Sequence, residues 1–159
     1  MIKKTIDLVE KAMDSAQLAF WQIEFPSGRV VFSKRKPKML GVKVKNEKTF
    51  QELKELVHSE DVDIVNQDLK EHLTGKKDNL ISEFRVKSLR KDKYIWLRVI
   101  GKIIEKSEEK TTLMGIAFNI TEEKNIVFEL EEIDKKYNYL FNSLTDAVII
   151  YDEEGKILE

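Results

Sequence analysis

The sequence predicts an α+β fold in which short helices pack on one curved antiparallel sheet, and three observations predict it. Residues 19–32 form two apolar segments around a turn, as in a β-hairpin. Three longer segments rich in β-branched and aromatic residues follow after residue 80, separated by polar turns. Between and around these strands, apolar residues recur at helical spacing. Five strands in two groups, with helices between the groups, are typical of the α+β class.

Composition limits the functions open to these 159 residues. Apolar residues make up 42% of the chain, enough for a core, and charged residues make up 36% with a net charge of −1. Because the charges nearly cancel, we expect neither nucleic-acid binding nor direct membrane contact. Cysteine is absent, which excludes disulfides, cysteine-ligated metals and cysteinyl-flavin chemistry. No apolar run reaches the roughly 18 residues of a membrane span, and we expect a cytoplasmic segment.

The N-terminal residues predict a helix over residues 1–18 that carries an apolar seam. Its apolar residues are spaced alternately four and three apart: Ile2, Ile6, Val9, Met13, Ala16 and Phe20. That spacing is typical of a helix that packs on another helix. The strands Ala19–Phe25 and Arg29–Phe32 follow, joined by a Pro-Ser-Gly turn.

Residues 34–57 predict no strand. Lys38 to Gly41 is typical of a short helical turn, and helical spacing continues through Phe50, Leu53, Leu56 and Val57. A longer helix is expected after Ser59, which can cap its N-terminus. Its apolar face carries Val62, Val65, Leu69 and Leu73, and Gly75 is its expected end.

Three consecutive strands are expected next, at Ile81–Leu89, Tyr94–Ile104 and Thr112–Ile120. Polar turns separate them, so we expect an antiparallel meander. Gly115 lies inside the last of these strands, where a glycine marks the close approach of another backbone, a ligand or a bulky core neighbour.

After Thr121 the helical period returns over residues 122–144. The apolar residues are again spaced four and three apart: Ile126, Leu130, Ile133, Tyr137, Leu140 and Leu144. About three heptads lie near the threshold for a coiled coil. A single sheet face covers about one long helix, so two seams predict a homodimer through both flanking helices, and we expect the two copies to be parallel. A monomer is the alternative.

The motifs of this chain resemble those of PAS domains. AFWQIEFPSGRVVFS (19–33) is similar to the first hairpin of the subclass that carries a tryptophan there, and HSEDV (58–62) is similar to its His-Pro-Asp-Asp signature. EFRV (83–86), YIWLRV (94–99) and GIAFNIT (115–121) resemble its Glu-Tyr-Arg strand, its strand tryptophan and its closing Asp-Ile-Thr motif. The order of these motifs over residues 18–124 is that of the family, which places the PAS domain at residues 19–121.

The chain departs from the family pattern at three places. Ser59 replaces proline, Asp92-Lys93 replaces the Asp-Gly turn, and Asn119 replaces the aspartate of the closing motif. With an amide at position 119, ion pairing with a basic side chain is lost, while hydrogen bonding is kept.

Residues 137–159 (YNYLFNSLTDAVIIYDEEGKILE) resemble the beginning of a second PAS domain, which we place at residues 145–159. The resemblance implies a sensory module of a larger protein, such as a two-component sensor histidine kinase, and no catalysis within this segment. The module would bind a small ligand and relay its ligand-bound or ligand-free state through the helix at residues 122–144. The alternative is a ligand-free PAS module for dimerisation and protein–protein interaction in a signalling or transcription regulator.

Candidate pocket residues occupy alternate strand positions or the apolar stripes of the helices. They are Trp21, Ile23, Met39, Leu69, Phe84, Leu97 and Ala117. Packing of these residues without a void is the alternative.

No cofactor or metal is predicted, because a zinc site needs three or four ligands and the chain has only His58 and His72. Haem or non-covalent flavin remains an alternative. For haem, the resemblance implies His72 as the axial ligand; otherwise His72 is a partly exposed helix residue and His58 organises the turn at Ser59.

Overall fold

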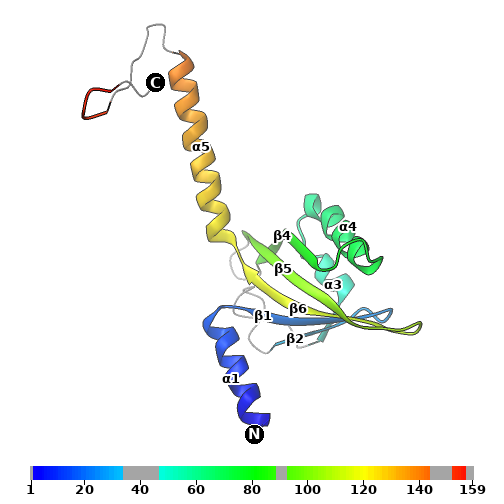
Figure 1. Cartoon of the computed structure of the whole chain (residues 1–159). Helices are drawn as coiled ribbons and strands as arrows, with labels where there is room; N and C mark the ends of the chain where they lie inside the picture. Colours follow the sequence, from blue (N-terminus) through cyan, green and yellow to red (C-terminus); the bar gives the residue numbers. More distant parts are fainter. Residues whose placement is uncertain (1, 34–46, 89–92, 144–151, 157–159) are drawn as a thin grey trace. The chain divides into compact units, whose positions relative to one another are not determined.

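A computed structural model of the chain describes residues 2–33, 47–88, 93–143 and 152–156 (Figure 1). The chain forms two compact units, Met1–Thr121 and Glu122–Glu159. The first unit contains the sheet and the helices packed on it. The second unit begins with one long helix.

One six-stranded antiparallel sheet forms the centre of the first unit, in the order β3-β2-β1-β6-β5-β4. The strands are β1 (Ala19–Phe25), β2 (Arg29–Phe32), β3 (Glu47–Thr49), β4 (Leu80–Ser88), β5 (Lys93–Lys106) and β6 (Thr111–Asn119). The α+β class and the five predicted strands are confirmed. The additional strand, β3, lies at the sheet edge and is too short for its alternation to show in the sequence.

Strands from the two halves of the sequence meet in the middle of the sheet, where β1 pairs with β6. Trp21 is the partner of Gly115, which is in turn the partner of Gly101 on β5. The Trp21 indole lies over both glycines, because a Cβ atom would lie 2.5 Å from its Cζ2 at Gly101 and 2.6 Å at Gly115. At Gly115 a Cβ would also lie against the Ile100 carbonyl oxygen, so this glycine is explained by the close approach of the β5 backbone together with the Trp21 ring.

The inner face of the sheet carries the core. Alternate strand positions and one helix supply its buried residues: Trp21, Ile23, Val30, Leu69, Leu80, Leu113 and Ala117. Helices α3 (Phe50–Lys54) and α4 (Val62–Leu73) lie on this side (Figure 1). The sheet and these helices enclose the site described below.

The outer face carries a row of apolar side chains across four strands. Phe20, Ile116, Ile100 and Ile81 are successive register partners. Ile81 is 54% exposed and the other three are half-buried. This row is an apolar surface on the opposite side of the sheet from the core.

Helix α1 (Ile2–Ser15) ends earlier than its seam predicted. Gln17 has a positive φ of 56°, so the chain turns there and Phe20 lies in β1 rather than on the helix. Placing Phe20 in the helical seam was therefore wrong. Leu8 and Val9 on α1 are 58% and 53% exposed.

The chain between α3 and α4 also differs from the prediction. Helical spacing indicated one helix through Val57, but α3 ends at Lys54. Leu56 and Val57 instead extend along the edge of β4: Lys87 N donates to Leu56 O (2.8 Å), and Val57 forms a bridge with Val86. The predicted turn at Lys38–Gly41 lies outside the described residues.

The side chain of His58, rather than that of Ser59, caps the short helical turn η1 (Ser59–Asp61) before α4. His58 Nδ1 accepts a hydrogen bond from Glu60 N at 3.3 Å. The end of α4 is as predicted, because Gly75 adopts a positive φ of 79° just after the last turn.

Helix α5 (Thr121–Ser143) begins one residue before its predicted start and exposes the predicted seam. The exposed fractions of its seam residues are 53% for Ile126, 61% for Leu130, 64% for Ile133, 49% for Tyr137 and 59% for Leu140. Leu144 lies outside the described residues. Among the described helices, none is both long and apolar enough to cross a membrane.

The acidic glycine turn after α5 is present at residues 152–156. Asp152 N donates to Lys156 O (2.9 Å), and Gly155 has a positive φ of 81°. The rest of the predicted second PAS start lies outside the described residues, so that assignment stays a prediction.

Candidate ligand cavity

An apolar cavity of about 120 Å³ lies between the inner face of the sheet and helices α3 and α4. Six of the seven predicted pocket residues line it: Trp21, Ile23, Leu69, Phe84, Leu97 and Ala117. Met39 lies outside the described residues. The void is present, while the role of these residues in binding a ligand stays a prediction.

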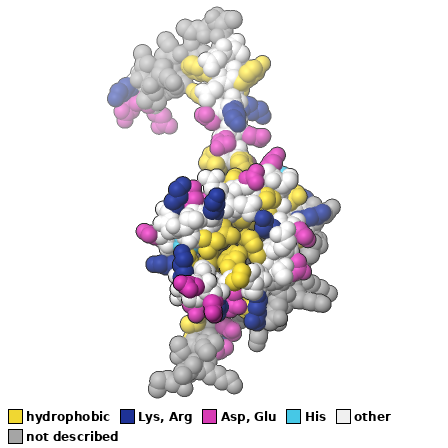
Figure 2. All heavy atoms as spheres, turned by 90° about the vertical axis from the view of Figure 1, so that its right-hand side faces the viewer, with side chains coloured by type: hydrophobic (Ala, Val, Ile, Leu, Met, Phe, Trp, Pro, Cys, Tyr) yellow, Lys and Arg dark blue, Asp and Glu magenta, His cyan; other side chains and the backbone are white. Residues whose placement is uncertain are grey.

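Sequence reasoning missed several lining residues that a finer analysis of alternation would have found. Leu80, Ser82 and Val86 share one face of β4 with Phe84, and all four line the cavity. Phe50 and Leu53 line it from α3. Figure 2 shows hydrophobic side chains gathered at the centre of one face of the molecule, with basic and acidic side chains around them.

Trp21 is the largest aromatic side chain among the lining residues and is only 5% exposed. Gly101 and Gly115 allow its ring to lie on the sheet. Its Nε1–H is buried without a hydrogen-bond acceptor among the described residues. An unsatisfied buried donor costs about 1–3 kcal/mol, so this position is not optimised for stability alone.

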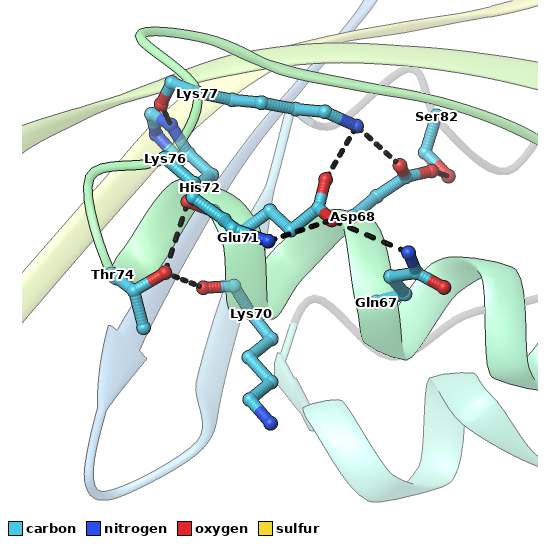
Figure 3. A network of polar contacts seen from close by, with 9 residues as sticks. All are labelled: Gln67, Asp68, Lys70, Glu71, His72, Thr74, Lys76, Lys77 and Ser82. Carbon is cyan, nitrogen blue, oxygen red and sulfur yellow. Dashed lines mark hydrogen bonds and ion pairs between the residues drawn. The ribbon is translucent and has the colours of Figure 1, made fainter.

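A polar network lies at the C-terminal end of α4 (Figure 3). Ser82, whose side chain reaches the cavity, donates from Oγ to Asp68 Oδ2 at 2.7 Å. Lys77 Nζ joins Asp68 Oδ1 (3.1 Å) to Glu71 Oε2 (2.9 Å), and its hydrogen bond lowers the pKa of Glu71. This network attaches one end of α4 to β4.

His72 is buried on α4, with 3% of its surface exposed, rather than partly exposed as the sequence indicated. Its Nδ1 lies 2.9 Å from Lys77 O, and its Nε2 accepts a hydrogen bond from Ile103 N at 3.2 Å. Both bonds form together when the neutral ring carries its proton on Nδ1. The Nε2 lone pair that a haem iron would require is thus engaged by β5, at the β-bulge between Ile103 and Glu105.

Asp61 and Arg85 hold the other end of α4 against the edge strand β4. The Asp61 carboxylate is 4% exposed and accepts hydrogen bonds from Arg85 N (2.8 Å), Nε (2.8 Å) and Nη2 (2.6 Å). These bonds hold the pKa of Asp61 below its ordinary value, although burial acts in the opposite direction. Arg85 also bonds Glu60 and lies over the Trp96 ring, 5.4 Å from its centroid.

The end of β6 is joined to β5 by the residues of the closing motif. Asn119 Oδ1 accepts hydrogen bonds from Thr121 N (2.9 Å) and Thr121 Oγ1 (2.5 Å). Trp96 N donates to Thr121 Oγ1 at 2.9 Å, and Ile120 N donates to Trp96 O at 2.9 Å. The amide at position 119 therefore keeps a hydrogen-bonding role.

The cavity provides apolar packing and few polar groups. Among the described residues, no cluster of three or more histidine, cysteine or acidic side chains is placed to hold a metal ion. The arrangement suits non-covalent binding of a small molecule between α4 and the sheet.

Comparison with known proteins agrees with this architecture. A family model described as PAS fold matches residues 29–117. No curated protein matches the chain.

Solved structures share the fold at low sequence identity. A sensory box histidine kinase/response regulator from Burkholderia thailandensis E264 superposes with a TM-score of 0.71 and 21% identity, over 82% of this chain and 98% of that one. The N-terminal domain of a diguanylate cyclase with PAS/PAC sensor from Marinobacter aquaeolei gives a TM-score of 0.57 and 20% identity, over 67% of this chain and 98% of that one.

Proposed function

The chain belongs to the PAS fold family, and from this premise we propose that it is the sensory module of a larger signalling protein, binding a small molecule in the cavity and relaying occupancy through α5. The similar solved structures come from a histidine kinase/response regulator and a diguanylate cyclase. A sensor histidine kinase is the parent protein that we favour. The segment itself would sense and transmit, while catalysis belongs to other parts of the parent.

The observation that carries this proposal is the apolar cavity of about 120 Å³. Protein interiors are normally packed with few voids larger than a water molecule. An engineered apolar cavity of roughly 150 Å³ binds benzene, so a void of this size suits one ring or a short chain. Drug-sized ligands occupy roughly 300–1,000 Å³, which makes haem or flavin a poor match for this volume.

A short route connects the cavity to the start of α5. Leu97 lines the cavity, and its neighbour on β5, Trp96, donates to Thr121 at the first position of α5. Leu97 is also the register partner of Asn119, which bonds Thr121. A ligand that displaces β5 would therefore act on the hydrogen bonds of Thr121.

We expect the purified chain to carry a small molecule and no haem or flavin. Native mass spectrometry should show an adduct that is lost on denaturation, and the visible spectrum should lack a Soret band and flavin absorption. A haem or flavin spectrum that persists through purification would contradict the proposed ligand size. A chain free of adducts in every preparation would favour the second function below.

The second candidate function is protein–protein interaction without a ligand. The apolar row of Phe20, Ile116, Ile100 and Ile81 on the outer sheet face favours it, because contiguous exposed apolar surface marks interaction sites. This function does not require the cavity to be occupied.

For either function we propose a parallel homodimer with α5 against α5 of a second copy. The seam from Ile126 to Leu140 is about half to two-thirds exposed, and its spacing of four and three residues is that of a coiled coil. A single helix with such a stripe gains stability by burying it. Helix α1 would add a second contact through residues such as Val9.

We expect Ile133→Asp to shift the chain from dimer to monomer at micromolar concentration, because the substitution places a charge at the centre of the seam. Sedimentation equilibrium measures the change. Tyr139→Asp is the matched control, since Tyr139 is 75% exposed and lies outside the seam. A monomeric unsubstituted chain, or a dimer that both substitutions leave unchanged, would exclude dimerisation through α5.

A further inference from the structure

Building on the proposed ligand-binding function, we infer that the cavity selects a small carboxylate: an apolar body of one ring or a short chain, with its carboxylate group at Lys54. Lys54 is the residue that would select this class of ligand. The distribution of charge along the cavity wall and the cavity volume both support this assignment.

Lys54 is the basic side chain that carries this inference. It is half-buried, lies at the last position of α3 and lines the cavity. Lys87 also lines the cavity, but it directly follows Val86 on β4. Successive residues of a strand point to opposite faces, so the Lys87 side chain lies on the face opposite to Val86 and Phe84. None of the described lining residues is acidic.

Lys54 differs from four other lysines in having no carboxylate partner among the described residues. Each of Lys11, Lys76, Lys77 and Lys110 lies within ion-pair distance of an acidic side chain. Because Lys54 lines the cavity from a half-buried position, its stem can lie along the apolar wall while its ammonium reaches the edge of the cavity, where it would attract an anion. Lys54 is thus the position at which a ligand carboxylate gains most.

The opposite end of the cavity disfavours an anion. There the Ser82 hydroxyl donates a hydrogen bond to Asp68, whose carboxylate also pairs with Lys77 (Figure 3). A second carboxylate beside Ser82 would face the Asp68 charge and find no free donor on the serine. The two ends of the cavity therefore differ: Lys54 lies near one end, and at the other end the Ser82 hydroxyl is bonded to Asp68, which is itself paired with Lys77.

The position of Lys54 is fixed by backbone contacts. Val57 N donates to Lys54 O at 3.0 Å, and Val57 pairs with Val86, so Lys54 lies near the Val86 end of β4. Ser82 lies four residues before Val86 on β4, which places it about 13 Å from Val86 at roughly 3.3 Å per residue. The lining between Val86 and Ser82 is therefore long enough for a ligand of about six carbon atoms.

We test the inference with hexanoate and its neutral isostere hexanamide at pH 7.5, using amide shifts in NMR titrations of the full chain. We expect hexanoate to bind about five- to tenfold more tightly, because only the carboxylate forms a charge-assisted contact with Lys54. Lys54→Met, which removes the charge and keeps an unbranched side chain one atom shorter, should abolish this preference. Lys102→Met is the matched control, because Lys102 is exposed and does not line the cavity.

Val65→Phe serves as a cavity-filling variant, because Val65 lines the cavity from a half-buried position on α4. It should weaken the binding of both compounds, with circular dichroism confirming that the variant is folded. Equal binding of hexanamide and hexanoate, both blocked by Val65→Phe, would overturn the role of Lys54 while supporting the proposed sensor function. A carboxylate preference that survives Lys54→Met would also overturn the inference. Hexanoate binding that Val65→Phe leaves unchanged would overturn it too, because the site would lie elsewhere.

Discussion

Replacing Asp61 with asparagine is expected to lower the free energy of unfolding by about 3 kcal/mol at neutral pH. The carboxylate is 4% exposed and accepts three hydrogen bonds from Arg85, which attach the start of α4 to β4. An amide of the same shape keeps one acceptor but brings an N–H₂ group against the guanidinium. Urea unfolding followed by tryptophan fluorescence measures the loss.

The effect of Asp61→Asn should depend on pH in a defined direction. Arg85 lowers the pKa of Asp61 in the folded chain, so the unfolded chain binds the proton first as pH falls. The stabilisation is therefore complete above about pH 4, near the ordinary pKa of aspartate, and is lost at lower pH. The unfolding free energies of the original chain and the variant should converge in acid.

Glu60→Gln provides the control for Asp61. Glu60 bonds the same guanidinium, but its side chain is 71% exposed, so its loss should cost no more than about 1 kcal/mol. A cost for Glu60→Gln equal to that of Asp61→Asn, or a difference between the original chain and Asp61→Asn that is the same at pH 3 and pH 7, would contradict this account.

Gly115→Ala is expected to destabilise the chain by more than about 3 kcal/mol, beyond the usual cost of overpacking. A Cβ there would lie against the Ile100 carbonyl oxygen and 2.7 Å from Gly101 Cα, both of which are backbone atoms of a central strand. Neither can move without disturbing the pairing of β5 with β6. Far-UV circular dichroism during urea unfolding measures the change.

Gly101→Ala provides a sharp comparison, because its nearest obstacle is the Trp21 ring rather than backbone. In a Trp21→Leu background, Gly101→Ala should lose most of its cost, whereas Gly115→Ala should keep it. Equal rescue of both substitutions by Trp21→Leu would mean that the indole, rather than the Ile100 carbonyl, is the obstacle at Gly115.

The strands could be predicted from the sequence because their signals are local. Ala19–Phe25 alternates apolar and polar residues from Trp21 onward, and Arg29–Phe32 is a short β-branched and aromatic run after a turn. The structure gives the same bounds for both. By contrast, β3 and the end of α3 depend on contacts between segments. Phe50 N donates to Gly28 O at 2.7 Å, and Val57 pairs with Val86; neither contact is encoded in a local period.

The residues of the candidate site also fall into two groups, those with a local sequence signal and those that depend on contacts between segments. Strand alternation and helical spacing predicted the six described pocket residues, since both periods indicate which side chains share a face. The polar contacts around α4 could not be predicted. His72 is buried because Ile103, on a distant strand, donates a hydrogen bond to its ring. Ser82 is polar within an apolar wall because Asp68 accepts a hydrogen bond from its hydroxyl.

The pairing of β1 with β6 has a consequence for synthesis of the chain on the ribosome. Phe25 pairs with Thr111, so one edge of β1 lacks its partner until β6 has been translated, on the order of ten seconds later. During that interval β1 can pair only with β2, and Trp21 has neither Gly115 nor Gly101 beneath its ring. The last strand to emerge therefore completes the centre of the sheet, and the nascent chain exposes an apolar strand edge until it does.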